Sequence, residues 1–216
     1  MGNFSERDHG HGAVVTVVGS PGIGKSRLVR EVSALATARR VEVFSTFCES
    51  HATDVPFRVV VRLMRAGMHI RGLDNQSARA RVRALIPDAD PEDMLLLDDL
   101  VGIADPNVEL PRIDPDARRR RLINATQLAR TKPTMAVIED AHWIDQVSES
   151  MLADFVAVIP QTHSLVLITY RPEYTGALSG VPGAQSIALA PLTDPETETL
   201  VSQLLGRTPQ STRWPP

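Results

Sequence analysis

The sequence predicts an α/β fold with a mostly parallel sheet, and two observations support this. Short runs of β-branched and apolar residues alternate along the chain with longer segments of helical periodicity. Most of these runs lack polar alternation, which is typical of strands covered by helices on both faces. We therefore expect five strands, at residues 13–18, 41–47, 134–138, 164–170 and 186–189.

Composition narrows the class of protein further. The chain has 216 residues, of which 43% are hydrophobic and 23% charged, enough for one good core. Its net charge of −3 gives no general attraction to nucleic acid or to an anionic membrane. A single cysteine, Cys48, excludes an intrachain disulfide and fits a reducing compartment. With no secretory signal and no apolar run near ~18 residues, we expect a cytoplasmic protein without membrane contact.

Residues 19–26 lie between the first expected strand and an amphipathic helix. They read Gly-Ser-Pro-Gly-Ile-Gly-Lys-Ser, which matches the phosphate-binding P-loop pattern G-x-x-x-x-G-K-[ST]. The glycines allow a tight turn that points successive N–H groups at a polyphosphate, at the positive end of the helix. Lys25 would add a charge near the β- and γ-phosphates, and Ser26 a hydroxyl for Mg²⁺. We expect ATP as the ligand, held by Gly19, Ser20, Pro21, Gly22, Ile23, Gly24, Lys25, Ser26 and Arg27.

Residues 56–130 have helical periodicity and predict a helical insertion between the second and third strands. Arginines dominate its first part, residues 58–83, and acids its second part, residues 88–99. We interpret this as neighbouring helices of complementary charge. DNA binding by the basic strip is the alternative. For the arginines at residues 118–121 the alternatives are a nucleic-acid-binding surface and a solvated helix face, and we favour the solvated face.

The expected strand at residues 134–138 ends in two acids, Glu139 and Asp140. An apolar strand followed by acids, downstream of a P-loop, fits the Walker B element. Such a strand brings one carboxylate to Mg²⁺, and its neighbour can orient an attacking water. A capped strand end without a ligand is the alternative.

The remaining elements complete the alternating pattern. A helix over residues 147–159 follows Asp145, a candidate N-cap, and the strand at 164–170 ends at Arg171. An arginine there could reach the γ-phosphate, or be an ordinary surface residue. A last helix, from Asp194 to Leu205, is expected to stop at Gly206. We expect residues 1–12 to be a flexible leader, 13–206 the ATPase domain and 207–216 a disordered tail.

The order of these motifs resembles one family. Residues 19–28 are followed by residues 139–145 (Glu-Asp-Ala-His-Trp-Ile-Asp), then 168–171, then 189–192. This sequence is similar to the ATPase module of the signal-transduction ATPases with numerous domains, which are AAA-related and also described as origin-recognition-like AAA ATPases. Bacterial LuxR-type regulators and class III adenylate cyclase-associated ATPases carry such modules. The resemblance covers roughly residues 12–206 and implies a P-loop NTPase three-layer sandwich with strand order 5-1-4-3-2.

The resemblance also implies roles for single residues. Glu139 takes the position of the Mg²⁺ ligand, where Asp is usual, and Asp140 that of the water-orienting acid. Thr169 and Arg171 match the end of the family's sensor strand, with Arg171 near the γ-phosphate. The implied catalytic residues are therefore Asp140, Glu139, Lys25 and Arg171, and the implied Mg²⁺ ligands are Ser26 and Glu139.

Three further residues match the family's extended Walker B motif: His142, Trp143 and Asp145. We expect Trp143 to serve packing. Two departures from the family stand out. The usual flanking segments are missing, so we expect the core of a larger regulator, either a truncated relative or a fragment. The acids at 139 and 140 are longer and then shorter than usual, which could shift Mg²⁺ or water and slow turnover.

Together these features predict an ATP-binding module that hydrolyses ATP slowly with Mg²⁺ and acts as a nucleotide-state switch. We expect it to work in a bacterial signalling or transcription regulator, with ATP, ADP and other protein domains or itself as partners, and without direct DNA contact. One alternative is an ATP-binding interaction module without significant turnover. Another is a P-loop kinase, although no arginine-rich lid beside an acceptor site is evident.

Overall fold

The computed structural model describes residues 12–50, 56–112, 114, 117 and 133–205. Nearly all of the expected leader, the tail from 207, the arginines at 118–121 and the helix stop at Gly206 lie outside the described residues. The described part is an α/β protein with a five-stranded sheet in which every pairing is parallel. Its strand order, β2-β3-β4-β1-β5, confirms the expected order 5-1-4-3-2.

The strands lie within a residue or two of the predicted positions. They are β1 (Ala13–Val18), β2 (Glu42–Phe47), β3 (Thr134–Glu139), β4 (Ser164–Tyr170) and β5 (Gln185–Ala188). One difference matters for the site: β3 continues through Glu139, which pairs with Phe47 of β2. The second acid, Asp140, is therefore the first residue beyond the strand.

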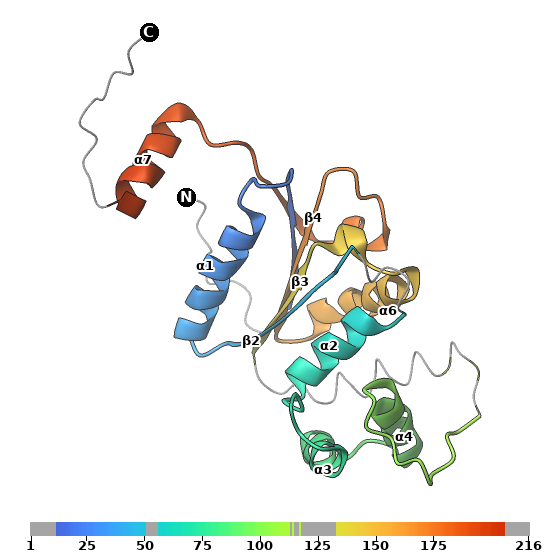
Figure 1. Cartoon of the computed structure of the whole chain (residues 1–216). Coiled ribbons are helices and arrows are strands. Elements are labelled where there is room, and N and C mark those ends of the chain that lie inside the picture. Colours follow the sequence, from blue (N-terminus) through green and yellow to red (C-terminus); the bar gives the residue numbers. More distant parts are fainter. Residues whose placement is uncertain (1–11, 51–55, 113, 115–116, 118–132, 206–216) are drawn as a thin grey trace.

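Helices cover both faces of the sheet, giving three layers (Figure 1). One face packs against α1 (Lys25–Ala38) and the other against α2 (Arg58–Gly67) and α6 (Gln146–Ala157). The pleat explains this division, because successive side chains of a strand point to opposite faces. In β3, Met135 and Val137 join the cluster beneath α1, while Ala136 and Ile138 join the larger cluster on the opposite face.

The predicted helical insertion is present between β2 and β3, with α2 followed by α3 (Asn75–Leu85) and α4 (Pro91–Leu100). Charge complementarity between α3 and α4 is confirmed by the contact of Arg83 with the buried Asp98, at 3.2 Å. The arginines of α2 differ from the expectation. Arg58 and Arg62 pair with Glu49, which lies just after β2 and outside the acidic block. The basic strip is thus partly neutralised from within the domain.

Shorter elements and the last helix complete the described chain. The turns η1 (Ala141–Trp143), η2 (Ile159–Gln161) and η3 (Ala177–Ser179) connect the later strands and helices, and α7 (Asp194–Leu205) follows β5. Asp145 is the N-cap of α6 as predicted, since its carboxylate accepts a hydrogen bond from the N–H of Ser148 at 2.8 Å. Within the described ranges, the apolar stretch of every helix is too short to cross a bilayer.

Candidate functional site

The carboxyl ends of β1, β3 and β4 meet at one edge of the sheet, where ligands bind in open parallel sheets. The P-loop follows β1 there, and Gly22 and Gly24 have left-handed backbones, with φ of 77° and 107°. Gly24 is the N-cap of α1, and no side chain caps that helix. The first N–H groups of α1 are therefore available to an anion, which is the arrangement that phosphate-binding loops use.

The Lys25 side chain crosses the inside of the P-loop. Its side chain is buried, and Nζ donates to the carbonyl oxygens of Gly19 at 2.7 Å and Ser20 at 3.1 Å. These bonds place a cation inside the curve of the loop. Ser26, the next residue, is exposed in the first turn of α1. The loop thus presents backbone donors, an ammonium and a hydroxyl, which are the groups a Mg-bound polyphosphate requires.

The two acids at the end of β3 differ in position. Glu139 follows Met135 and Val137 in the alternation of β3, so it lies on the face of the sheet that α1 covers. Asp140 has a left-handed backbone, with φ of 55°, and its N–H donates to Thr169 Oγ1 at 3.0 Å. That bond ties the end of β3 to β4, the strand between β3 and β1.

Arg171 is the first residue beyond β4, and a hydrogen bond joins the end of β4 to the start of the P-loop. The residue before it, Tyr170, accepts a bond from the N–H of Gly19 at 3.3 Å. The Arg171 guanidinium lies over the Trp143 ring, 5.5 Å from its centroid, and 3.9 Å from Glu173. The expected packing role of Trp143 therefore includes a cation–π contact with Arg171.

Sequence reasoning assigned no role to two features of this site. The bond between Asp140 and Thr169 joins segments far apart in the sequence, and no local pattern announces it. The His142 side chain is only 6% exposed, and its Nδ1 lies 4.0 Å from Asp140 Oδ1. Burial, and then the charge of Arg171, lower the pKa of His142. In the sequence, the only sign that His142 belongs to this site is its position two residues after Asp140.

Cys48, the first residue after β2, is a buried free thiol. Burial raises the pKa of Cys48 to about 12. In the part of the chain that the structure describes, no three His, Cys, Asp or Glu side chains gather into a metal site. Mg²⁺ needs fewer protein ligands, because it binds through one or two carboxylates together with phosphates and waters.

Gly24→Ala is expected to destabilise the protein, because a Cβ at a left-handed residue costs about 1–2 kcal/mol. For a chain of this size, that lowers Tm by about 2–8 °C in a thermal melt. Gly180→Ala is the matched control, since Gly180 has φ of −111° and a Cβ added there would meet no other atom within 4 Å. Equal Tm values for the two variants would contradict the strain assigned to Gly24.

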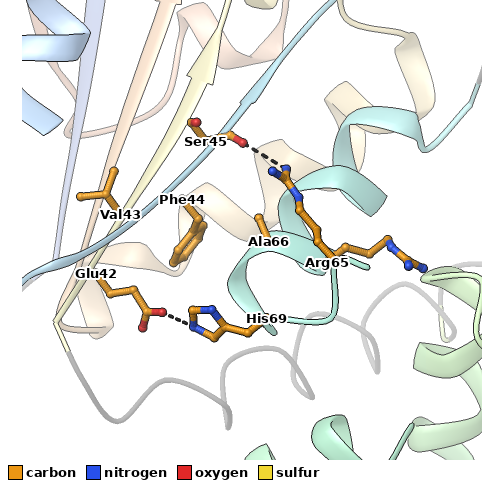
Figure 2. A pocket seen from close by; sticks show the side chains of 8 residues that line it. Glu42, Val43, Phe44, Ser45, Arg65, Ala66 and His69 are labelled. Atoms are coloured by element: carbon orange, nitrogen blue, oxygen red, sulfur yellow. Dashed lines mark hydrogen bonds and ion pairs between the residues drawn. The ribbon is translucent and has the colours of Figure 1, made fainter. Parts of the chain in front are cut away.

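A separate hollow of about 450 Å³ lies between β2 and the end of α2 (Figure 2). The Glu42 carboxylate contacts His69 Nε2 within it, and Arg71 donates to the Ser45 carbonyl at 3.4 Å. The hollow follows the amino-terminal half of β2, at the edge of the sheet. It is therefore distinct from the site at the carboxyl ends of the strands.

An all-parallel sheet with a P-loop after its first strand and two acids at the end of its third defines a P-loop nucleotide-binding protein. The chain belongs to the AAA ATPase domain family, whose model matches residues 3–168. This confirms the resemblance to an AAA-related ATPase module, and with it nucleotide binding as the activity of this class.

The chain is also similar to individual proteins. A protein of Rhizobium meliloti (strain 1021), described as uncharacterized, is 26% identical over 199 residues; the match covers 89% of this chain and 19% of that protein. Among solved structures, a Signal Transduction ATPase with Numerous Domains carrying a tetratricopeptide repeat sensor, from Pyrococcus horikoshii, is 12% identical with a TM-score of 0.48. That match covers 89% of this chain and 23% of the other. Drosophila ORC bound to DNA is 14% identical with a TM-score of 0.39, over 90% of this chain and 42% of that one.

Proposed function

We propose that the chain binds Mg-ATP at residues 19–27 and hydrolyses it slowly, so that its nucleotide state acts as a switch. The observation that carries this proposal is a chain of hydrogen bonds across three strand ends. Gly19 bonds to Tyr170 between β1 and β4, and Asp140 bonds to Thr169 between β3 and β4. These bonds hold the P-loop, the acids and Arg171 at one edge of the sheet.

Each group has a defined task in hydrolysis. The N–H groups of residues 20 and 22–25 and the Lys25 ammonium share the charge that develops on the γ-phosphate during in-line attack of water. Asp140 orients that water, and Arg171 approaches the γ-phosphate. Ser26 and Glu139 supply the oxygens for Mg²⁺. When bound, Mg²⁺ neutralises charge on the β- and γ-phosphate oxygens.

The switch belongs, in this proposal, to a cytoplasmic bacterial signalling or transcription regulator. The chain spans about a fifth of the length of the Rhizobium relative that it matches. This supports a module that works within a longer protein. Its partners would then be other domains or a second copy, with the nucleotide state changing how they contact this module.

Binding without turnover is the second candidate, and the position of Arg171 favours it. Its guanidinium already lies over Trp143 and beside Glu173, so it must leave these contacts to reach a phosphate. An arginine that stays there would leave the γ-phosphate charge less compensated, and hydrolysis would be slow or absent.

Two measurements on the wild-type protein distinguish slow hydrolysis from binding without turnover. Fluorescent ATP-analogue titration with Mg²⁺ reports binding, and phosphate release from Mg-ATP reports turnover above the Lys25→Ala background. We expect saturable binding and slow release that EDTA abolishes. Binding without release would select the interaction module, and no binding of ATP would refute both.

A further inference from the structure

Tyr174 ties the segment that begins at Arg171 to a helix on one face of the sheet. Its phenol donates a hydrogen bond to the carboxylate of Glu149, in the first turn of α6. Its ring packs against the ring of Tyr170, the last residue of β4, with 5.2 Å between the ring centroids. Burial, and then the bond to Glu149, raise the pKa of Tyr174, so the phenol keeps its proton at neutral pH. The side chain is therefore anchored on both α6 and β4.

Gly176 allows the chain to pass close to this anchor. A Cβ added at Gly176 would overlap the Glu149 carboxylate and the Tyr174 hydroxyl. The φ of Gly176, −71°, suits any residue, so glycine is needed here for space alone. Two residues later, Leu178 is fully buried in the core to which α6 contributes. The segment after β4 is thus fixed to the domain at two points.

The backbone of Arg171 is restrained by this anchor through a tight turn. The N–H of Tyr174 donates to the Arg171 carbonyl at 3.0 Å, which closes a four-residue turn with Pro172 as its second residue. Proline is favoured at that position of the common turn types, and it disfavours a helical backbone at the residue before it. Arg171 thus lies between the end of β4 and a turn whose last residue is held by α6.

Both ends of Arg171 are supported by one segment of the chain. The guanidinium lies over Trp143, 5.5 Å from the ring centroid, in the turn η1 that leads into α6. The backbone is held through Tyr174 and its partner Glu149 in the first turn of that helix. Residues 143–149 therefore determine where Arg171 lies at the edge of the sheet that carries the P-loop. With the backbone fixed, only the side chain has to turn from Trp143 towards a bound phosphate.

We propose that Tyr174 is a positioning residue for Arg171, acting through its hydrogen bond to Glu149. The bond holds the turn, so that the Arg171 guanidinium reaches the γ-phosphate without reordering of the backbone. This inference rests on the role of Arg171 in the proposed function. A displacement of about 1 Å at such a group can cost about 100-fold in rate, so loss of the anchor is expected to lower turnover.

Conservative changes at the two partners test the bond while the packing is kept. Tyr174→Phe retains the ring against Tyr170 and removes only the donor, and we expect it to lower kcat about tenfold while KM for Mg-ATP stays within threefold. Glu149→Ala should do the same, whereas Glu149→Gln keeps an acceptor oxygen and should retain most of the wild-type kcat. Glu198→Ala, at an exposed position of α7, is the matched control and should change neither constant. Wild-type kcat in Tyr174→Phe, or equal losses in the two Glu149 variants, would overturn the proposal.

A double-mutant cycle with Arg171→Ala separates positioning from a general structural effect. Mg-ADP with aluminium fluoride, which mimics the phosphoryl group in the transition state, gives a readout that requires no turnover. Tyr174→Phe should weaken binding of this mimic about tenfold in the wild-type background but less than twofold in the Arg171→Ala background. Equal losses in both backgrounds would overturn this inference alone. If Arg171→Ala bound the mimic like the wild type, Arg171 would have no place in the proposed function, and this inference would fail with it.

Discussion

Lys25→Ala is expected to reduce phosphate release to the protein-free background and to weaken Mg-ATP binding by about 100-fold or more. A pair of unit charges about 4 Å apart is worth about 4 kcal/mol at an effective dielectric constant of 20. Each 1.4 kcal/mol corresponds to a factor of about ten in affinity, so a 100-fold loss leaves room for partial compensation by solvent. The substitution also removes the bonds from Nζ to Gly19 and Ser20 that shape the P-loop.

Two matched variants make this result specific. Arg30→Ala removes a cation from the exposed side of α1 and should leave binding within about twofold of wild type. Lys25→Arg keeps the charge but changes the geometry of the donors, and should restore part of the affinity. Isothermal titration calorimetry measures all three variants. If Lys25→Ala bound Mg-ATP like the wild type, the nucleotide would not be held by this loop.

Asp140→Asn should separate binding from turnover. The amide replaces the carboxylate without a change in size, and Asn tolerates the left-handed backbone that residue 140 adopts. The N–H that donates to Thr169 is retained. Since a positioned acid–base group contributes about 10²–10⁴-fold, we expect kcat to fall by about 100-fold or more. Affinity for Mg-ATP should stay within about threefold.

Single-turnover phosphate release and analogue titration test this prediction together. Asp88→Asn is the control, because it makes the same chemical change at an exposed residue between α3 and α4. Unchanged turnover in Asp140→Asn would remove Asp140 from the water-orienting role. The same measurement on Glu139→Gln would then show whether the neighbouring acid carries it.

Local patterns predicted the strands and the P-loop because both depend on short stretches of sequence. The β-branched run of β1 and the glycines at 22 and 24 determine their own backbone geometry. The order of the strands came from the family resemblance, since several orders suit the same five runs. The interpretation of the charged insertion was right for Arg83 and Asp98 but missed the pairing of α2 with Glu49.

Contacts between distant side chains could not be predicted in this way. The position of Arg171 over Trp143 depends on how the segments after β3 and β4 pack, and no spacing within either segment encodes it. The same holds for the bond from Asp140 to Thr169 and for the enclosure of His142. These contacts set the geometry of the candidate site, whereas its composition could be read from the sequence.

The pairing of β1 has a consequence for how the protein folds. Its neighbours in the sheet are β4 and β5, and Ala13 pairs with Leu165, about 150 positions later. Closing a loop of that length costs about 4 kcal/mol of chain entropy, and such distant pairing slows folding. During synthesis, the P-loop therefore leaves the ribosome long before either neighbour of its strand exists. The nucleotide site, which begins with β1 and the P-loop, is completed only after β4 and β5 have been synthesised.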